Sequence, residues 1–222
     1  MLENATTTRP QRPRLADPKP LSRPPVDFHP QVLGDDAPPD AREALQSMYE
    51  SWERLHVSQH DIEDHKRLAD VAKRTVERVL AGAERSIGRL KTQREAIHQR
   101  INEVVRPLAH RDPVGVEIRQ HFKTTRQPFG EVDAAIRAGD LQSVRAVLGA
   151  PHYLSGLDLQ QQAVILDRAR QVFTPDDYSK LRALDAASDK VEAFAQRFTG
   201  ELAKFIRERQ DADTAKLQGL EK

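Results

Sequence analysis

The sequence contains no cysteine and few aromatic residues. Among its 222 residues are seven Phe, three Tyr and one Trp, too few for a broad three-layer core. The absence of cysteine excludes a disulfide framework and thiol chemistry. No apolar run approaches the roughly 18 residues of a membrane-spanning helix, and residues 1–10 lack the apolar stretch of a secretory signal. We therefore expect neither a membrane span nor a signal peptide.

The short motifs of common catalytic and phosphate-binding sites are also missing. The chain has no GxxxxGKS or GxxxxGKT loop, no GxGxxG, no HExxH and no GxSxG. Carboxylates are abundant, but their spacing places them on charged helix faces, and no pair is singled out by its setting. We expect a protein that is not an enzyme and that has no cofactor.

Charge is balanced over the whole chain but not along it. The net charge is +1, yet residues 35–64 carry two basic and nine acidic groups, and residues 65–126 carry fifteen basic and seven acidic groups. Such asymmetry often directs self-pairing or partner binding. The overall balance argues against a dedicated nucleic-acid-binding protein, which usually has a basic domain.

Proline is concentrated near the N-terminus, where nine of the 14 prolines lie in residues 1–39. Because proline fixes φ and has no N–H, neither a helix nor a central strand forms through this density. The composition predicts an extended arm, residues 1–39, without a core of its own. We expect other subunits to hold this arm. Its predicted partner contacts are four apolar and three basic side chains: Leu21, Val26, Phe28, Val32, Arg12, Arg14 and Arg23.

Helical periodicity begins after the arm. A first helix is expected from its N-cap Asp40 to a break near residues 57–60, where Ser58 is the predicted cap of the next helix. Trp52 is expected in the core of this helix, with an anchor into another subunit as the alternative. Residues 60–108 then carry apolar residues alternately four and three apart, a heptad repeat typical of a coiled coil. The predicted seam contains Val76, Leu80, Ala83, Ile87, Leu90, Ile97, Ile101, Val104 and Leu108, and Arg94 interrupts it.

Residues 111–174 alternate short helical patterns with Gly and Pro breakers. Four short helices are predicted, with Asp140 and Asp158 as N-caps. They cover Val114–Phe122, Val132–Ala138, Leu141–Leu148 and Leu159–Phe173. The predicted core of this module contains Phe129, Ile136, Val144, Leu148, Tyr153, Leu154, Leu157, Val164, Ile165 and Phe173.

A last long helix is expected to begin at Thr174, with Pro175 at its first position and Asp177 at its third. Its apolar seam continues to Phe205, and we expect the helix to fray after Arg209. The seam contains Leu181, Leu184, Val191, Phe198, Leu202 and Phe205.

These patterns predict an all-α fold. The two long helices would form an antiparallel coiled-coil hairpin, with the short-helix module at the turn and the Pro-rich arm outside. Opposite charges on the two helices favour that register. The expected divisions are the arm (1–39), the first helices with the heptad helix (40–110), the module (111–174) and the last helix with its tail (175–222).

Two local patterns indicate other functions. His56, His60 and Asp64 would line one face of a continuous helix, as a zinc site needs, but the expected break at Ser58 favours a solvated face, and we assign no metal. The basic residues between Lys66 and Arg100 are suited to phosphate contact. No aromatic residue between residues 53 and 121 is available to stack on bases, so a salt-bridged helix face is favoured. These residues are Lys66, Arg67, Lys73, Arg74, Arg78, Arg85, Arg89, Lys91, Arg94 and Arg100.

One stretch of the module carries a resemblance. Ala135-Ile136-Arg137-Ala138-Gly139-Asp140 and Val144-Arg145-Ala146-Val147-Leu148-Gly149-Ala150-Pro151-His152-Tyr153-Leu154-Ser155-Gly156-Leu157 resemble a segment of helical proteins encoded among phage and prophage structural genes. The resemblance covers about a tenth of the chain and transfers no catalytic residue. It implies a small virion-associated or assembly protein, and a Pro-rich arm that straps neighbouring subunits fits it.

We therefore expect a non-enzymatic structural or assembly protein of a phage particle, which docks through its arm and its helical hairpin. Its partners would be other protein subunits, with copies of itself as one option. Its location would be the virion, after assembly in the host cytoplasm. The alternatives are a cytoplasmic coiled-coil adaptor or chaperone-like protein and, third, a nucleic-acid-associated helical protein.

Overall fold

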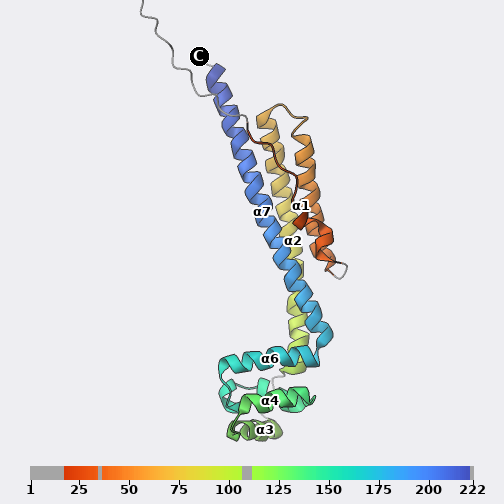
Figure 1. Cartoon of the computed structure of the whole chain (residues 1–222), viewed down its shortest axis with the longest axis vertical. Coiled ribbons are helices and arrows are strands. Elements are labelled where there is room, and N and C mark those ends of the chain that lie inside the picture. Colours follow the sequence, from red (N-terminus) through yellow and green to blue (C-terminus); the bar gives the residue numbers. More distant parts are fainter. Residues whose placement is uncertain (1–17, 35–36, 107–111, 221–222) are drawn as a thin grey trace, which may run out of the picture. The chain divides into compact units, whose positions relative to one another are not determined.

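The computed structural model describes residues 18–34, 37–106 and 112–220, and most of this part of the chain is helical (Figure 1). It contains seven α-helices and three short 3-10 helices, with no strand among the described residues. The predicted all-α fold is confirmed. Contacts divide the chain into two compact units.

The first unit contains residues 18–29, 45–83 and 193–220 of the described chain. Its helical parts come from α1 (Pro39–Ser58), α2 (His65–Val105) and α7 (Pro175–Leu220). Each helix places apolar residues three or four positions apart on one buried face, as the periodicity predicts. The buried side chains are Leu45, Met48, Trp52 and Leu55 of α1, Leu68, Ala69, Ala72 and Val79 of α2, and Phe194, Phe198, Leu202 and Phe205 of α7.

The position of the break between α1 and α2 was predicted, but the residue that caps α2 was not. Helix α1 ends at Ser58, inside the expected break. The prediction that Ser58 caps the next helix is wrong, because its hydroxyl donates to the carbonyl of Arg54 in its own helix. The carboxylate of Asp64 caps α2 instead, and accepts from the backbone N–H groups of Lys66 (2.9 Å) and Arg67 (3.2 Å).

The second unit contains residues 30–34, 37–44, 84–106 and 112–192 of the described chain. Four short helices fold together within it (Figure 1). Helix α3 packs against α5, α4 and the 3-10 helix η3, and α4 packs against α5 and α6. Their bounds are Pro113–Thr124 (α3), Pro128–Arg137 (α4), Leu141–Leu148 (α5), His152–Ser155 (η3) and Leu159–Phe173 (α6).

The starts and ends of these short helices follow from a few residues. As predicted, Asp140 caps α5 through the N–H of Ser143, and Asp158 forms a capping box with Gln161 at the start of α6. Gly139 adopts a φ of 75° just after α4, a left-handed conformation that glycine adopts without strain. Local residues therefore set the starts of α5 and α6 and the end of α4, whereas the predicted start at Val132 is wrong, because α4 begins at Pro128.

The core of the module was predicted in part. Five of the predicted residues are buried: Ile136, Val144, Leu148, Leu157 and Ile165. Tyr153, Leu154 and Val164 are exposed, so their assignment to the core is wrong. The first two lie on the four-residue helix η3, which is too short to turn every apolar side chain inward. The core also contains Phe122 and Val132, which the sequence reading left out.

In the second unit, α2 and α7 run in opposite directions. Arg94 of α2 pairs with Asp185 of α7 at 2.6 Å, and Arg100 pairs with Asp177 at 2.9 Å. Residue numbers rise along α2 where they fall along α7, so the local register is antiparallel. The opposite charges on the two helices agree with the sequence analysis, but the pairing of Arg100 with Asp177 was not predicted, since Asp177 was assigned to the start of the helix.

The end of α7 differs from the prediction. The helix continues to Leu220, so the expected fraying after Arg209 is wrong. Gln210, Asp213 and Thr214 of this extension line a small hollow together with Lys66, Ala69 and Asp70 of α2. The apolar repeat ends at residue 205, but helix-forming residues and these neighbours carry the helix further.

Substituting a buried seam residue tests this packing. Leu202→Asp places a charge at a fully buried position of α7, and Ile97→Asp does so at a position of α2 that is 7% exposed. We expect each to lower the free energy of unfolding by about 3 kcal/mol or more. Leu217→Asp is the matched control, because this leucine of α7 is 57% exposed and its replacement should change stability by less than about 0.5 kcal/mol. Equal denaturation midpoints for Leu202→Asp and Leu217→Asp would contradict the packing.

Candidate docking surfaces

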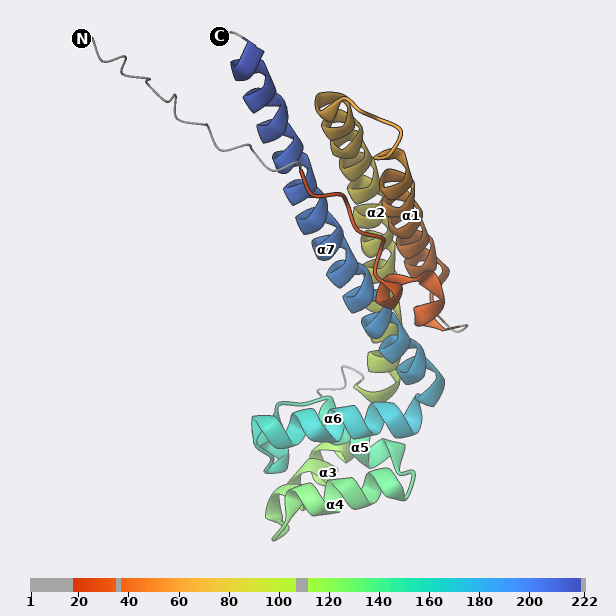
Figure 2. The ribbon, with the colours of Figure 1, turned by 45° about the horizontal axis from the view of Figure 1, so that its top comes forward.

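Residues 18–29 run along the first unit, between α1 and α7 (Figure 2). The backbone of Leu21 is held by one glutamine, since its N–H donates to Oε1 of Gln59 at 2.6 Å and its carbonyl accepts from Nε2 of Gln59 at 2.9 Å. Nδ1 of His56 lies 2.7 Å from the same carbonyl. The Leu21 side chain is only 5% exposed. One side chain of the last turn of α1 and one directly after that helix thus fix an extended residue by its backbone.

The next backbone carbonyl of this segment is held by Trp52. Its indole Nε1 donates to the carbonyl of Ser22 at 2.8 Å, and the side chain is fully buried. Burying an indole normally requires a partner for its N–H, and the segment supplies it. The prediction that Trp52 belongs to the core is confirmed. The alternative, an anchor into another subunit, is contradicted because the ring is enclosed by its own chain.

Aromatic rings join the segment to α1 and α7. Phe28 stacks on Phe194 with ring centroids 4.4 Å apart and an interplanar angle of 12°. Trp52 contacts Phe194 and Phe198 at centroid distances of 6.1 and 6.0 Å. We call Phe28, Trp52, Phe194 and Phe198 the aromatic cluster. It brings together three parts of the sequence that are far apart along the chain.

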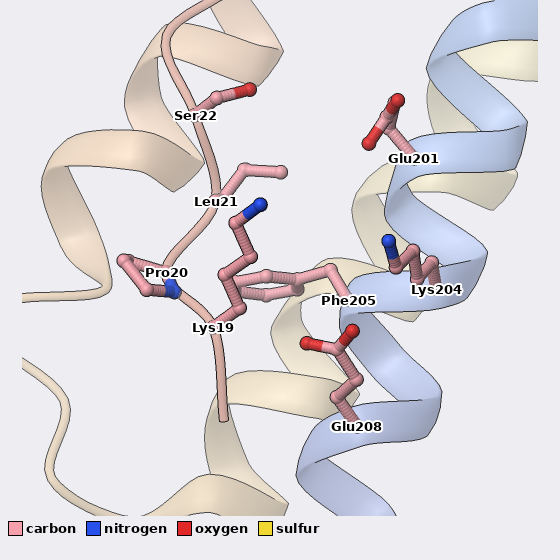
Figure 3. Close-up of a pocket in the computed structure, with 8 residues that line it drawn as sticks. All are labelled: Lys19, Pro20, Leu21, Ser22, Glu201, Lys204, Phe205 and Glu208. Atoms are coloured by element: carbon pink, nitrogen blue, oxygen red, sulfur yellow. The ribbon is translucent and has the colours of Figure 1, made fainter. Parts of the chain in front are cut away.

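A further attachment lies beside α7 (Figure 3). Lys19, Pro20, Leu21 and Ser22 line a pocket with Glu201, Lys204, Phe205 and Glu208 of α7, and Phe205 points from the helix toward the segment. Nη1 of Arg209 donates to the carbonyl of Lys19 at 3.2 Å, and its guanidinium lies 3.5 Å from the Phe205 ring centroid. Burial lowers the pKa of Arg209. The arginine is therefore packed as part of the wall that holds the segment.

The predicted arm contacts fall into three groups. Leu21 and Phe28 face their own chain, as described above. Val26 is 77% exposed, Val32 is 43% exposed and Arg23 is exposed. Two further predicted residues, Arg12 and Arg14, lie outside the described residues.

The expectation that the arm needs support from other subunits is corrected for residues 18–29. Their support comes from side chains of α1, of Gln59 in the loop after it, and of α7. The segment is also less extended than predicted, because it contains the 3-10 helix η1 (Val26–Phe28), and η2 (Pro30–Leu33) follows it. The proline-rich composition excludes an α-helix here, but it does not exclude docking onto the chain's own helices.

The predicted seam residues are all buried on α7 but only partly buried on α2. On α7, all six predicted residues are buried: Leu181, Leu184, Val191, Phe198, Leu202 and Phe205. On α2, Ala83, Leu90, Ile97 and Ile101 are buried, whereas Val76, Leu80, Ile87 and Val104 are half-buried. Thr75 and Val79 are buried one position before Val76 and Leu80, so the buried face is displaced by one residue there. Leu108 lies outside the described residues.

The metal pattern does not have the geometry it would need. His56 belongs to α1, whereas His60 and Asp64 follow the end of that helix at Ser58, so the three do not share one helix face. His56 faces the Leu21 carbonyl, and Asp64 caps α2. Within the described ranges, no group of three or more His, Cys, Asp or Glu side chains is arranged to hold a metal ion.

Three residues of the basic stretch pair with carboxylates. Arg89 contacts Asp40 at 2.5 Å and Glu43 at 3.7 Å, while Arg94 and Arg100 pair with α7 as described. A hydrogen bond from Arg100 lowers the pKa of Asp177. These pairings favour the salt-bridged interpretation of the stretch over phosphate contact.

The sequence reading missed three residues that hold the segment. Phe194 lies three residues after Val191 and four before Phe198, so the heptad spacing contained its signal. Gln59 and Arg209 carry no such signal, because a polar side chain that binds a distant backbone follows no period. Their roles depend on the fold that brings residues 19–21 to them.

Comparison of the chain with protein-family models, with curated proteins and with solved structures finds no match. Among the described residues, no helix is both long enough and apolar enough to cross a membrane.

Gln59→Ala tests the backbone contacts of the segment. The Leu21 amide should exchange its hydrogen about fivefold faster in this variant, because a bond worth about 1 kcal/mol is lost. Gln120→Ala, at an exposed position of α3, is the control and should leave that exchange rate unchanged. Hydrogen exchange of the full-length chain followed by NMR gives both rates. Equal Leu21 rates in wild type and Gln59→Ala would show that Gln59 does not hold the segment.

His98 predicts a pH dependence of stability. Burial, followed by the charges of Arg170 and Arg94, lowers the pKa of His98, and Asp185 acts in the opposite direction. The unfolded chain then binds this proton more tightly than the folded chain does, so stability is lost as pH falls through the unfolded and then the folded pKa. Chemical denaturation between about pH 7 and pH 5 should show a smaller loss for His98→Gln than for wild type. Parallel curves for the two proteins would contradict this assignment.

Proposed function

We propose that the chain is a non-enzymatic structural or assembly protein of a phage particle. It docks into a multi-subunit assembly through its N-terminal segment and its paired long helices. Its partners are other protein subunits, and its location is the virion. The resemblance of residues 135–157 to proteins encoded among phage structural genes supports the setting.

The observation that carries this proposal is the way residues 18–29 are bound. Side chains of Gln59 and Trp52 form hydrogen bonds with the backbone of the segment. Its Leu21 side chain is buried, and its Phe28 ring stacks on Phe194. An extended strap of this kind covers much surface per residue, and its prolines reduce the entropy lost on docking. Because these contacts are made within the chain, docking onto other subunits is left to the exposed side chains of the segment, Arg23 and Val26.

The long helices support the same role. We propose that α2 and α7 form an antiparallel coiled-coil hairpin, with the short helices α3 to α6 at its turn. The pairs Arg94–Asp185 and Arg100–Asp177 support that register, as do the residues of α2 and α7 that share a hollow in the first unit. Such a hairpin would offer a helical surface to neighbouring subunits without needing a catalytic cleft.

Apolar side chains remain exposed where partners would bind. Val26 and Val32 flank the His29–Pro30 peptide, and Arg23 precedes them on the same stretch of chain. A second group lies on the module and contains Val114, Val116, Tyr153, Leu154 and Leu159. Exposed apolar side chains such as these are candidates for contacts with other subunits.

The test is the presence of the chain in purified particles of the phage that encodes it. Mass spectrometry should find the wild-type chain in the particles after stringent purification. A chain that stays in the soluble host fraction would instead indicate an adaptor or chaperone-like protein. A steep loss of affinity for nucleic acid with rising salt would indicate the third alternative.

The double variant Val26→Asp, Val32→Asp tests whether the segment takes part in docking. We expect reduced incorporation into particles with an unchanged melting temperature, because both side chains are exposed. Val57→Asp is the matched control, since Val57 is 58% exposed but lies on α1. Incorporation equal to that of the control would reject docking through this part of the chain.

A further inference from the structure

We propose that a hollow in the second unit, between the end of α2, the turn after α5 and the start of α6, binds the C-terminal residue of a partner subunit through its carboxylate and an apolar side chain. The inference rests on the proposed function, since docking subunits supply the chain terminus. It names the chemistry of one partner contact and the residues that receive it.

The hollow is large enough for a small ligand. Its volume is about 630 Å³, which lies within the range of small-molecule sites. Asn102 of α2 and Arg106, just after that helix, line one part of it, and Leu159 and Gln162 of α6 line another. Residues 149–152, the turn between α5 and η3, complete the lining. All of these residues belong to the second unit.

The walls of the hollow are held in place without a ligand. Nε of Arg106 donates to the carbonyl of Leu148 at 2.9 Å, and Nε2 of Gln162 donates to the carbonyl of Ala150 at 3.0 Å. These bonds fix the turn after α5 from α6 and from the residue that follows α2. A site whose walls are already fixed loses little conformational entropy when a ligand binds.

The polar groups left at the hollow are mainly hydrogen-bond donors. Arg106 uses its Nε–H on Leu148, so both of its Nη atoms remain as donors. Oδ1 of Asn102 accepts from Nη2 of Arg170 at 3.3 Å, so the remaining polar group of Asn102 is its NH2. His152 adds a half-buried imidazole. Such a set of groups suits a ligand that accepts hydrogen bonds.

The charge around the hollow is positive. Among the described residues, Arg106 lines it and no carboxylate does. Arg170 adjoins it through Asn102, and its Nε is buried with no hydrogen-bond partner in the described chain. Burial lowers the pKa of Arg170, and the charge of Arg106 acts in the same direction, whereas Asp167 and Tyr178 act in the opposite one. An anion in the hollow would therefore offset the repulsion between the two arginines.

An apolar wall lies beside these donors. Ala150 and Pro151 line the hollow, and so does Leu159, whose side chain is exposed. Covering an exposed leucine with another apolar side chain is favourable. An inorganic anion would leave this wall in water, whereas a carboxylate joined to an apolar side chain fills both parts of the hollow. The last residue of a protein chain offers that combination, and arginine pairs well with its carboxylate.

Capped amino acids are suitable probes for the full chain. N-acetyl-leucine carries the carboxylate and the side chain, N-acetyl-leucinamide lacks the charge, and N-acetylglycine lacks the side chain. In an NMR titration, N-acetyl-leucine should shift the backbone amide signals of Gly149, Ala150 and Gln162. We expect it to bind about tenfold or more tightly than N-acetyl-leucinamide and severalfold more tightly than N-acetylglycine.

Three results of this titration would overturn the proposal. The first is the absence of shifts at these amides, and the second is equal affinity for N-acetyl-leucine and N-acetyl-leucinamide. The third is inorganic phosphate that binds as tightly as N-acetyl-leucine, because the hollow would then be a site for small anions only.

Two variants test the individual contacts. Arg106→Gln should weaken binding of N-acetyl-leucine about tenfold or more and leave that of N-acetyl-leucinamide unchanged. Arg182→Gln, at an exposed position of α7, is the matched control and should change neither affinity. Because Arg106 also holds Leu148, the second variant is Leu159→Ala, which should keep the wild-type melting temperature. It should remove the preference for N-acetyl-leucine over N-acetylglycine, and a preference retained in Leu159→Ala would contradict the proposed apolar contact.

The outcome is distinguishable from that for the phage role. A chain that is found in purified particles but does not bind N-acetyl-leucine would keep the proposed function and reject the carboxylate site. A chain that binds N-acetyl-leucine but is absent from particles would keep the carboxylate site and reject the phage role.

Discussion

Burial of the aromatic cluster is the interaction on which the first unit depends. Trp52 and Phe198 are fully enclosed, and Phe194 lies between them and Phe28. The cluster contains four of the 11 Phe, Tyr and Trp residues of the chain. Because Phe28 belongs to the N-terminal segment, the same contacts that stabilise the helices also hold the segment. A substitution in the aromatic cluster should therefore weaken both the packing of the helices and the binding of the N-terminal segment to them.

Much of the fold could be predicted because local chemistry decides it. Gly139, Asp140 and Asp158 fix helix ends through backbone conformation and capping, which depend on neighbours in sequence alone. The displaced buried face of α2 was not predictable in this way. Small residues such as Ala72, Thr75 and Ser86 line it, and they are buried although they carry little apolar surface. A reading based on large apolar residues therefore favours Val76 and Leu80.

The anchor residues of the segment could be predicted from the sequence, but the residues that bind them could not. Leu21 and Phe28 stand out as apolar anchors in a polar, proline-rich stretch, and both are anchors in the structure. Their partners, Gln59 and Phe194, lie 38 and 166 residues away. No local pattern encodes such pairings, since they arise once tertiary packing has brought the helices together. For this reason the sequence did not indicate that residues 18–29 bind to helices of the same chain.

The most direct test of this account is a double-mutant cycle between Phe28 and Phe194 in the dilute full-length chain. Trp52 is the sole tryptophan and lies beside Phe194, so its fluorescence reports unfolding in wild type, Phe28→Ala, Phe194→Ala and the double variant. The stacked geometry predicts a coupling energy of about 0.5–1.5 kcal/mol. Strictly additive effects of the two substitutions would contradict the claim that the segment is seated on its helices through this pair.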